Sequence, residues 1–161
     1  MWPPPLFFPV PVTKFVVMSL ATAGLYELYW LYRNWCLVRD RERTDIWPFW
    51  RAFFGYFFIY PLLARIYDQQ PRSRTPVLLA VGWIGLNLLW RLPDPYWFVS
   101  FLSLFLLLPA QLVANRRNAK AAPDHDRNER FTPWNWVAVV LGVAFWGLAI
   151  AGMLLPDNPA S

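Results

Sequence analysis

The chain has 161 residues, of which 57% are hydrophobic, 19% are aromatic and only 16% are charged, with a net charge of +5. This balance excludes a disordered or low-complexity chain, because such chains contain few aromatic and branched apolar residues. The single cysteine excludes an intramolecular disulfide and a metal site built from several thiolates. The excess of apolar residues indicates an integral membrane protein.

The N-terminal part of the chain is rich in proline. Five of the first twelve residues are proline, which predicts an extended segment rather than a helix. We expect residues 1–12 to lie at the outer surface of the membrane. Residues 14–37 form the first predicted span, since they exceed the ~20 residues that cross ~30 Å of hydrocarbon. Apolar residues continue well beyond Ala23, which disfavours a cleaved signal peptide.

The next apolar stretch, residues 47–66, is ambiguous because only Ala52–Ala64 is free of charge. If it crossed the membrane, the 15 lysines and arginines would divide nine to six between the two sides. If it enters and leaves on one side, they divide 13 to two, which the positive-inside rule favours. We therefore predict a non-spanning aromatic helix over 47–66, re-entrant or interfacial, on the cytoplasmic side.

Three further apolar stretches, residues 76–92, 95–114 and 133–155, approach or exceed spanning length. Each begins where a capping side chain precedes a proline, at positions 75–76, 94–95 and 132–133. This pair of residues is typical of a helix start. Because the linker between 76–92 and 95–114 is short, we expect these two helices to form an antiparallel hairpin.

The predicted fold is therefore an all-α membrane bundle of four transmembrane helices plus one non-spanning aromatic helix. A single membrane domain covers residues 13–155, and residues 156–161 form a short outer tail. Since the number of crossings is even, both termini are expected on the outer side of the membrane.

Glu27 is the most informative polar residue of the predicted spans. It lies ~18 Å along the helix from Phe15, just past the bilayer midplane, where an unpaired carboxylate is costly. Asn87 lies at a similar depth in its own span, and Arg51 is long enough to approach from the cytoplasmic side. We predict a polar cluster of Glu27, Asn87 and Arg51, which either clamps helices together or binds a proton or ligand.

A second polar feature lies at the cytoplasmic end of the 95–114 span. Gln111, Asn115 and Asn118 are spaced so that they share one face of a helix. Side-chain amides both donate and accept hydrogen bonds, and they link helices in membranes. We expect this face either to anchor the 116–130 loop or to bind a lipid headgroup.

The sequence contains no pattern that indicates catalysis. It has no glycine-rich phosphate loop and no nucleophile elbow, and its single histidine, His125, makes a poor metal site. We therefore expect no enzyme, no catalytic residue, no metal and no cofactor. Acidic residues interrupt the basic runs beside the membrane, so we expect anionic lipid headgroups rather than nucleic acid as partners.

Two aromatic stretches carry a resemblance to known sequences: ATAGLYELYWLYRNW at 21–35 and IWPFWRAFFG at 46–55. They resemble an uncharacterised family of small bacterial inner-membrane proteins with a Thr-x-Gly-[Leu/Ile]-Tyr-x-x-Tyr-Trp motif. The resemblance covers roughly residues 13–150. It implies a multi-pass protein of the bacterial cytoplasmic (inner) membrane, in a domain of unknown function, and it implies no activity.

Two functions agree with these observations. The first is a non-enzymatic accessory or structural subunit that acts through helix packing, with a membrane-protein partner or a second copy of itself. The alternative is a small oligomeric transporter or lipid-handling protein that uses the polar cluster around Glu27.

Overall fold

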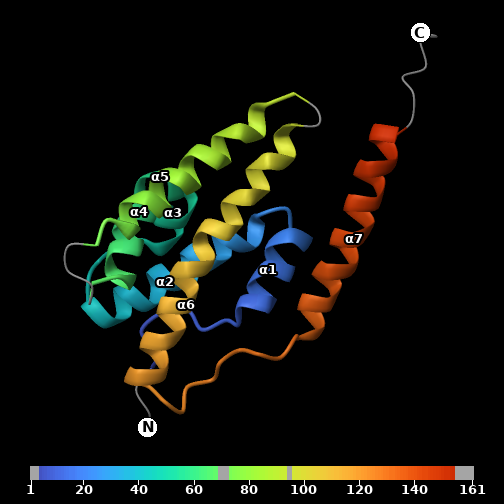
Figure 1. Ribbon diagram of the computed structural model, residues 1–161. Helices are drawn as coiled ribbons and strands as arrows, with labels where there is room; N and C mark the ends of the chain where they lie inside the picture. Colours follow the sequence, from blue (N-terminus) through green and yellow to red (C-terminus); the bar gives the residue numbers. More distant parts are fainter. Residues whose placement is uncertain (1–3, 69–72, 94–95, 155–161) are drawn as a thin grey trace.

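The computed structural model describes residues 4–68, 73–93 and 96–154, and every regular element among them is a helix (Figure 1). The predicted all-helical class is therefore confirmed. The α-helices are α1 (Val12–Ala21), α2 (Leu25–Glu42), α3 (Pro48–Phe53), α4 (Gly55–Ile66), α5 (Thr75–Leu88), α6 (Ser103–Ala121) and α7 (Pro133–Leu154). Two 3-10 helices, η1 (Leu89–Arg91) and η2 (Tyr96–Leu102), flank the connection between α5 and α6.

The region 14–37, predicted to form one span, is divided into α1 and α2 by a tight turn. Ala23 and Gly24 both have positive φ angles, of 48° and 89°. The Gly24 backbone N–H donates to the Ser19 carbonyl at 2.8 Å, which closes the end of α1. The Thr22 hydroxyl then accepts the Tyr26 backbone N–H at 2.9 Å and starts α2. The prediction of one continuous helix is therefore corrected, because this turn reverses the chain.

The N-terminal segment, residues 4–11, packs against the rest of the molecule, and three of its residues are buried. Phe7 and Val10 are 0% and 1% exposed, and the segment lies next to the C-terminal end of α6 (Figure 1). The described end of α7 lies at the opposite end of the molecule (Figure 1). The two described ends of the chain therefore lie at opposite ends of the molecule, and the side of the membrane on which each terminus lies stays a prediction.

Residues 47–66 form two short helices, α3 and α4, instead of one. Phe54 (φ −90°, ψ 41°) separates the two helices, because its backbone is not helical. Arg65, near the end of α4, forms an ion pair with Glu42, the last residue of α2, at 2.9 Å. Since α3 begins only a few residues after Glu42, both ends of this segment lie at the same end of the molecule.

The remaining helices are the longest and most apolar. α5 and α6 run side by side in opposite directions, as the short linker predicts (Figure 1). Among the described residues, two helices are long and apolar enough to cross a membrane, Tyr96–Ala121 with 26 residues and Pro133–Leu154 with 22. Four such helices were predicted. The turn at Gly24 divides the first predicted span into two helices. The helix Thr75–Arg91 is shorter than the length needed to cross a membrane.

The predicted helix starts have different outcomes. At the start of α7, the Thr132 hydroxyl accepts the Asn135 backbone N–H and the Asn135 side chain accepts the Thr132 backbone N–H. This reciprocal pair confirms Thr132 as a cap. At the start of α5, Arg74 occupies the cap position without a side-chain hydrogen bond, so Thr75 is not the cap. The third expected start, at 94–95, and the tail 156–161 lie outside the described residues.

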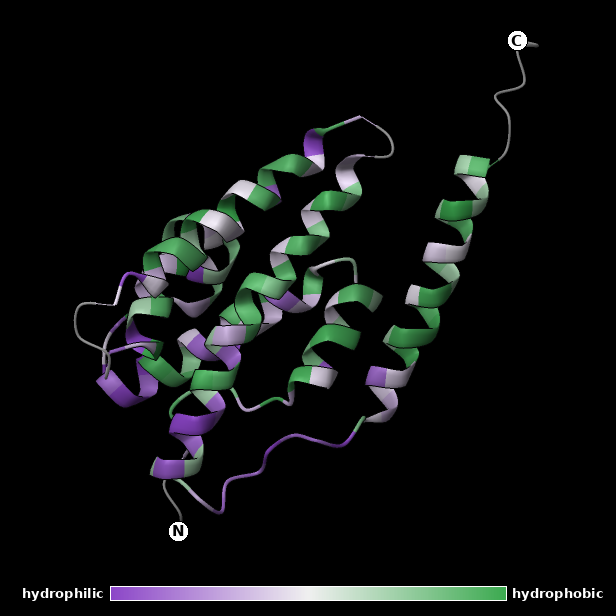
Figure 2. Cartoon of the chain, viewed as in Figure 1, coloured by the Kyte–Doolittle hydropathy of each residue, from purple (hydrophilic) through white to green (hydrophobic). Residues whose placement is uncertain are grey.

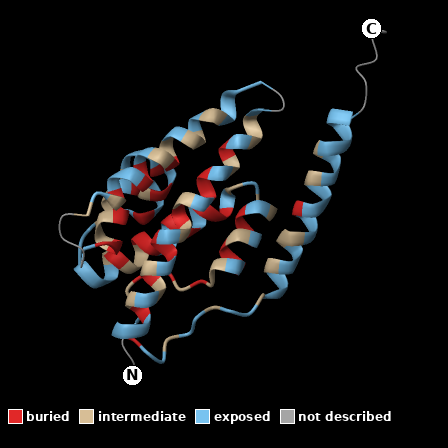
Figure 3. Ribbon diagram, in the orientation of Figure 1, coloured by how far each residue is buried: buried red, intermediate tan, exposed pale blue. Residues whose placement is uncertain are grey.

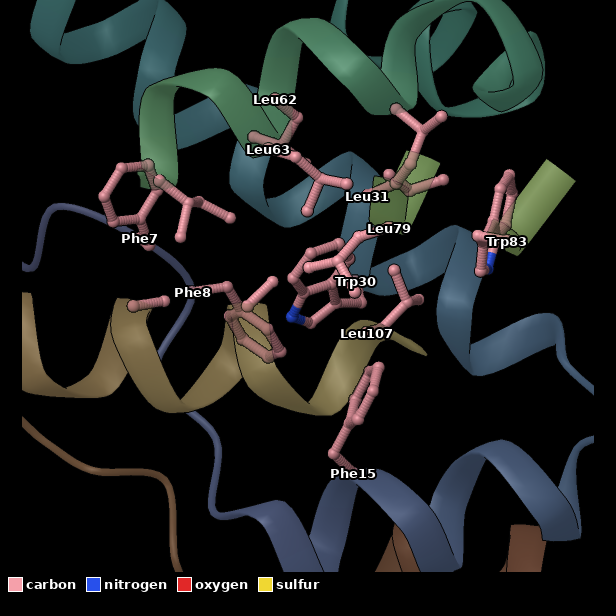
Figure 4. Packing of buried hydrophobic residues seen from close by; sticks show 14 of the residues in the cluster. Phe7, Phe8, Phe15, Trp30, Leu31, Leu62, Leu63, Leu79, Trp83 and Leu107 are labelled. Carbon is pink, nitrogen blue, oxygen red and sulfur yellow. The ribbon is translucent and has the colours of Figure 1, made fainter. Parts of the chain in front are cut away.

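The buried core lies between α2, α4, α5, α6 and the N-terminal segment (Figure 3). Trp30 is 0% exposed, and Figure 4 shows its indole among apolar side chains from other elements, including Phe15, Leu79 and Leu107. In contrast, α7 is apolar along its length but almost wholly exposed (Figures 2 and 3). Its one buried residue is Gly142, which packs against the backbone of Ala21.

Candidate functional site

A cavity of about 820 Å³ lies where the α1–α2 turn, the α3–α4 break, α5 and the start of α6 converge. Ala23 and Gly24, at the α1–α2 turn, have small side chains and leave space on one side of the cavity. Gly55 lets α4 approach the side chain of Leu31. Six of the fifteen residues that line the cavity are aromatic: Phe53, Tyr56, Trp83, Trp90, Trp97 and Phe101. The polar groups on the wall are Glu27, Asn87, Ser100 and Ser103. A cavity of this size accepts a drug-sized molecule.

Glu27 is placed at the cavity by the turn that divides the predicted first span. Because α2 begins at Leu25, Glu27 lies in its first turn, where the positive end of the helix dipole favours a carboxylate. The residue is 6% exposed. Its Oε2 accepts a hydrogen bond of 2.9 Å from the indole Nε1 of Trp83 on α5. Over the described part of the chain, no lysine or arginine forms an ion pair with Glu27.

The structure brings together two of the three residues of the predicted polar cluster. Asn87 lines the same cavity as Glu27 and donates through Nδ2 to the Trp83 carbonyl at 2.9 Å. Arg51 does not join them. Its guanidinium lies 4.5 Å from the centre of the Trp35 ring and 5.1 Å from that of Phe58. The cavity therefore holds a carboxylate without the cation that was expected beside it.

Sequence reasoning missed Trp83, which connects the other two residues. It is 4% exposed and packs against Tyr56 with ring centres 5.6 Å apart. A signal was present, because a tryptophan in the middle of an apolar helix must find an acceptor for its N–H. Four residues further along the same helix face is Asn87. The pair therefore marked the face of α5 that meets Glu27.

The three amides on α6 hold the N-terminal segment in place. Asn118 accepts the Phe7 backbone N–H at 3.0 Å and donates to the Phe7 carbonyl at 2.8 Å. Gln111 donates to the carbonyls of Phe8 and Val10 at 3.2 and 3.1 Å. Asn115 also donates to Val10, at 2.9 Å. Gln111 and Asn118 are therefore buried against the N-terminal segment, whereas the partly buried Asn115 also borders a pocket with residues of the 116–130 loop.

Two residues of α2 complete this arrangement. Asn34, which sequence reasoning did not single out, accepts the Phe8 backbone N–H at 3.0 Å. Trp30 donates from its indole to the side-chain oxygen of Gln111 at 2.6 Å. The backbone polar groups of a proline-rich segment without secondary structure are thus satisfied by side chains from two helices, as buried backbone requires.

Among residues 4–68, 73–93 and 96–154, no three His, Cys, Asp or Glu side chains lie close enough to hold a metal ion. Comparisons with models of protein families, with curated proteins and with solved structures gave no match. The resemblance to small bacterial inner-membrane proteins stays a prediction.

Proposed function

We propose that the chain is an integral membrane protein that binds an amphipathic organic cation in the cavity beside Glu27. In this proposal α5 with η1, η2 with α6, and α7 cross the bilayer. The hairpins α1–α2 and α3–α4 enter from one side and return to it. Exposed apolar side chains along α7 support this placement, because water would not favour them on an unpaired helix.

The distribution of charge supports an orientation for this arrangement. Hydrophilic residues gather where α2, α4 and α6 end (Figure 2), and the last turns of these helices carry Arg39, Arg41, Arg65 and Lys120. Arg91 ends η1, at the connection between α5 and α6. The positive-inside rule places the basic end in the cytoplasm. The N-terminal segment then lies on the cytoplasmic side and the end of α7 on the outer side, in place of the two outer termini expected from the sequence.

The single observation that carries the proposal is the Glu27 carboxylate, which faces an aromatic cavity and has no cationic partner among the described residues. A buried carboxylate is stabilised when a positive charge enters beside it. Aromatic faces attract the same cations, most strongly where water is excluded. A ligand with one positive charge and a large apolar body satisfies both the carboxylate and the aromatic wall.

A direct test measures binding of tetraphenylphosphonium to the purified protein in nanodiscs of zwitterionic lipid, by isothermal calorimetry or tryptophan fluorescence. We expect saturable binding that Glu27→Gln weakens at least about tenfold, since about 1.4 kcal/mol is one factor of ten. The matched control is Glu129→Gln, in the exposed loop, which should bind as the parent does. The neutral analogue triphenylphosphine oxide should bind more weakly than the cation.

Two results would contradict the proposal. One is equal affinity of Glu27→Gln and the parent protein, when both have the same thermal unfolding midpoint. The other is equally tight binding of the neutral analogue. Transport of the bound cation is a further step. We expect it only if two or more copies assemble, because three spans enclose little of a pathway.

A second candidate function is the accessory subunit, which acts through helix packing. The observation that favours it is α7, which contacts the rest of the molecule mainly through α1 and leaves most of its surface uncovered. In a mild detergent, this candidate predicts a homo-oligomer or a complex with another membrane protein. A monodisperse monomer that still binds the cation would favour the binding function alone.

A further inference from the structure

Four arginines from four different helices meet at the basic end of the molecule: Arg41 of α2, Arg51 of α3, Arg65 of α4 and Arg117 of α6. Each of two aromatic rings lies beside two of these guanidiniums. Phe7 has the guanidiniums of Arg41 and Arg117 at 5.0 and 5.2 Å from its ring centre. Trp35 has those of Arg51 and Arg65 at 4.5 and 5.4 Å.

The negative charge at this arginine cluster does not balance the positive charge. Glu42 is the one carboxylate that pairs with it in the described chain, with two hydrogen bonds to Arg65 at 2.9 and 3.1 Å. It also lies 3.7 Å from Arg41. Four guanidiniums and one carboxylate leave a net charge of +3 on these five side chains.

The other hydrogen bonds of the cluster go to neutral backbone carbonyls. Arg41 donates to Leu6 at 2.6 Å, and Arg117 donates to Ile66 at 3.1 Å. The buried Nε of Arg117 has no hydrogen-bond partner. Burial lowers the pKa of Arg41, and the charges of Arg117 and Arg65 lower it further against the opposing effect of Glu42. Gathering like charges in this way is unfavourable unless an anion joins them.

The cluster remains open to an anion from outside. The side chains of Arg41 and Arg65 are 33% and 35% exposed. Guanidinium groups bind phosphate oxygens in pairs of parallel hydrogen bonds, which makes arginine the side chain suited to phosphate. One phosphate group offers more oxygens to the four guanidiniums than the single carboxylate of Glu42 does.

The surface beside the cluster is apolar. Arg51 lies on α3 between aromatic residues that are largely exposed, Phe49 at 59%, Trp50 at 48% and Phe53 at 60%. Their rings contact one another, and those of Phe49 and Phe53 are stacked with centres 6.2 Å apart. Exposed aromatic side chains next to basic ones are typical of the boundary between headgroups and acyl chains. The juxtaposition favours a phosphate that is attached to a lipid.

We propose that the cluster of Arg41, Arg51, Arg65 and Arg117 binds the phosphate of an anionic phospholipid, with the acyl chains against the aromatic face of α3. The four arginines lie outside the Glu27 cavity, which shares only Phe53 with the aromatic face of α3, and binding of the phosphate does not depend on the ligand proposed in that cavity. Its occupant neutralises the excess charge and fastens α2, α3, α4 and α6 to one another at the membrane surface.

The test uses the full chain, delipidated in detergent, and measures binding by microscale thermophoresis. The probe is dihexanoyl phosphatidic acid, and dihexanoyl phosphatidylcholine serves as the zwitterionic comparison. Inorganic phosphate tests the other source of the same chemistry. The variant is Arg51→Gln, because the interactions of this guanidinium are with two rings and its loss leaves the helix contacts of Arg117 intact. Arg127→Gln, in the exposed loop, makes the same change of charge as a control.

We expect phosphatidic acid to bind at least about tenfold more tightly than phosphatidylcholine or inorganic phosphate. Arg51→Gln should weaken binding about fivefold or more, and Arg127→Gln should change it less than twofold. Equal effects of the two variants would overturn the site. Equal binding of inorganic phosphate would overturn its assignment to a lipid. Thermal unfolding of each variant, and of Arg41→Gln as a second cluster variant, establishes that the proteins compared are folded.

Discussion

The indole Nε1 of Trp83 donates a hydrogen bond of 2.9 Å to the carboxylate of Glu27, and this bond joins the middle of α5 to the first turn of α2. Both residues are almost completely buried, at 4% and 6% exposed. The bond satisfies one carboxylate oxygen and leaves the rest of the group directed at the aromatic cavity. The same contact therefore holds two helices together and orients the acceptor for a ligand.

Loss of the indole donor should be more costly than loss of the carboxylate charge. Trp83→Phe leaves a buried carboxylate without its hydrogen bond, so we expect a loss of about 2–4 kcal/mol from desolvation and packing together. Glu27→Gln keeps an oxygen acceptor, and we expect a loss below about 1 kcal/mol. Unfolding in detergent by titration with SDS measures both values. The control is Trp134→Phe, at a residue 80% exposed; a loss of the same size there would contradict the role given to Trp83.

The amide of Asn118 should be essential for the placement of the N-terminal segment. Asn118→Leu leaves both the N–H and the carbonyl of Phe7 unpaired inside the protein, and each such group costs about 1–3 kcal/mol. We expect lower thermal stability and faster proteolysis within residues 4–11. Lys120→Leu, on the exposed side of α6, should change neither readout. Undiminished protection of the segment in Asn118→Leu would show that these hydrogen bonds do not hold it.

The turn between α1 and α2 depends on residues that tolerate a left-handed backbone. Gly24 has φ of 89°, so Gly24→Ala should destabilise the protein by about 1–2 kcal/mol although nothing would contact the added Cβ. Gly147 lies within α7 and also has free space around its Cβ position. Gly147→Ala should therefore stabilise the protein by up to about 1 kcal/mol through helix propensity. Chemical unfolding compares the two, and a stabilising Gly24→Ala would mean that α1 and α2 form one helix.

The ion pair of Glu42 should make the stability of the protein depend on pH in the acidic range. The hydrogen bond from Arg65 holds the pKa of Glu42 below its usual value, aided by the charges of Arg65 and Arg41 and opposed by partial burial. A carboxyl whose pKa is lowered by folding stabilises the protein above its unfolded pKa, about 4.3 for glutamate. This contribution is lost as the pH falls from that value through the lowered one. Unfolding midpoints from pH 6 to pH 3 should decrease less in Glu42→Gln than in the parent protein, and parallel curves would contradict the assignment.

Reporter fusions should find the two ends of the chain on opposite sides of the membrane. The proposed architecture requires a cytoplasmic reporter at the N-terminus and within the loop at 123–126, and an outer reporter after the last residue. The reason is the α1–α2 hairpin, which brings residues 4–11 back to the basic end. An outer N-terminal reporter together with an outer C-terminal one would restore four spans and exclude the hairpin from the membrane.

Much of the helical organisation was predictable from local patterns. The sequence predicts the long apolar helix α7 and its cap at Thr132. It also predicts the short linker between α5 and α6. The turn at Gly24 was not predicted, because residues 14–37 are long enough and apolar enough to form one span. Whether such a run continues or reverses depends on what packs against it.

Some residues of the candidate sites were predictable from local patterns, and others were not. Glu27 and Asn87 were identifiable because polar side chains are costly in apolar helices. The role of Arg51 was not, since its position depends on Trp35 and Phe58 from two other helices. The partner of the α6 amides was also hidden from sequence reasoning. Phe7 and Asn118 are 111 residues apart in the chain, and no local spacing relates them.

The central claim is that the Glu27 carboxylate is the group that meets a cation in the cavity. Carbodiimides that partition into membranes modify carboxyl groups shielded from water, and mass spectrometry after digestion measures the modified fraction at Glu27. Saturating tetraphenylphosphonium should reduce this fraction at Glu27 several-fold, while triphenylphosphine oxide leaves it unchanged and the modification of Glu129 is the same in all samples. An equal modified fraction at Glu27 with and without the cation would contradict the account.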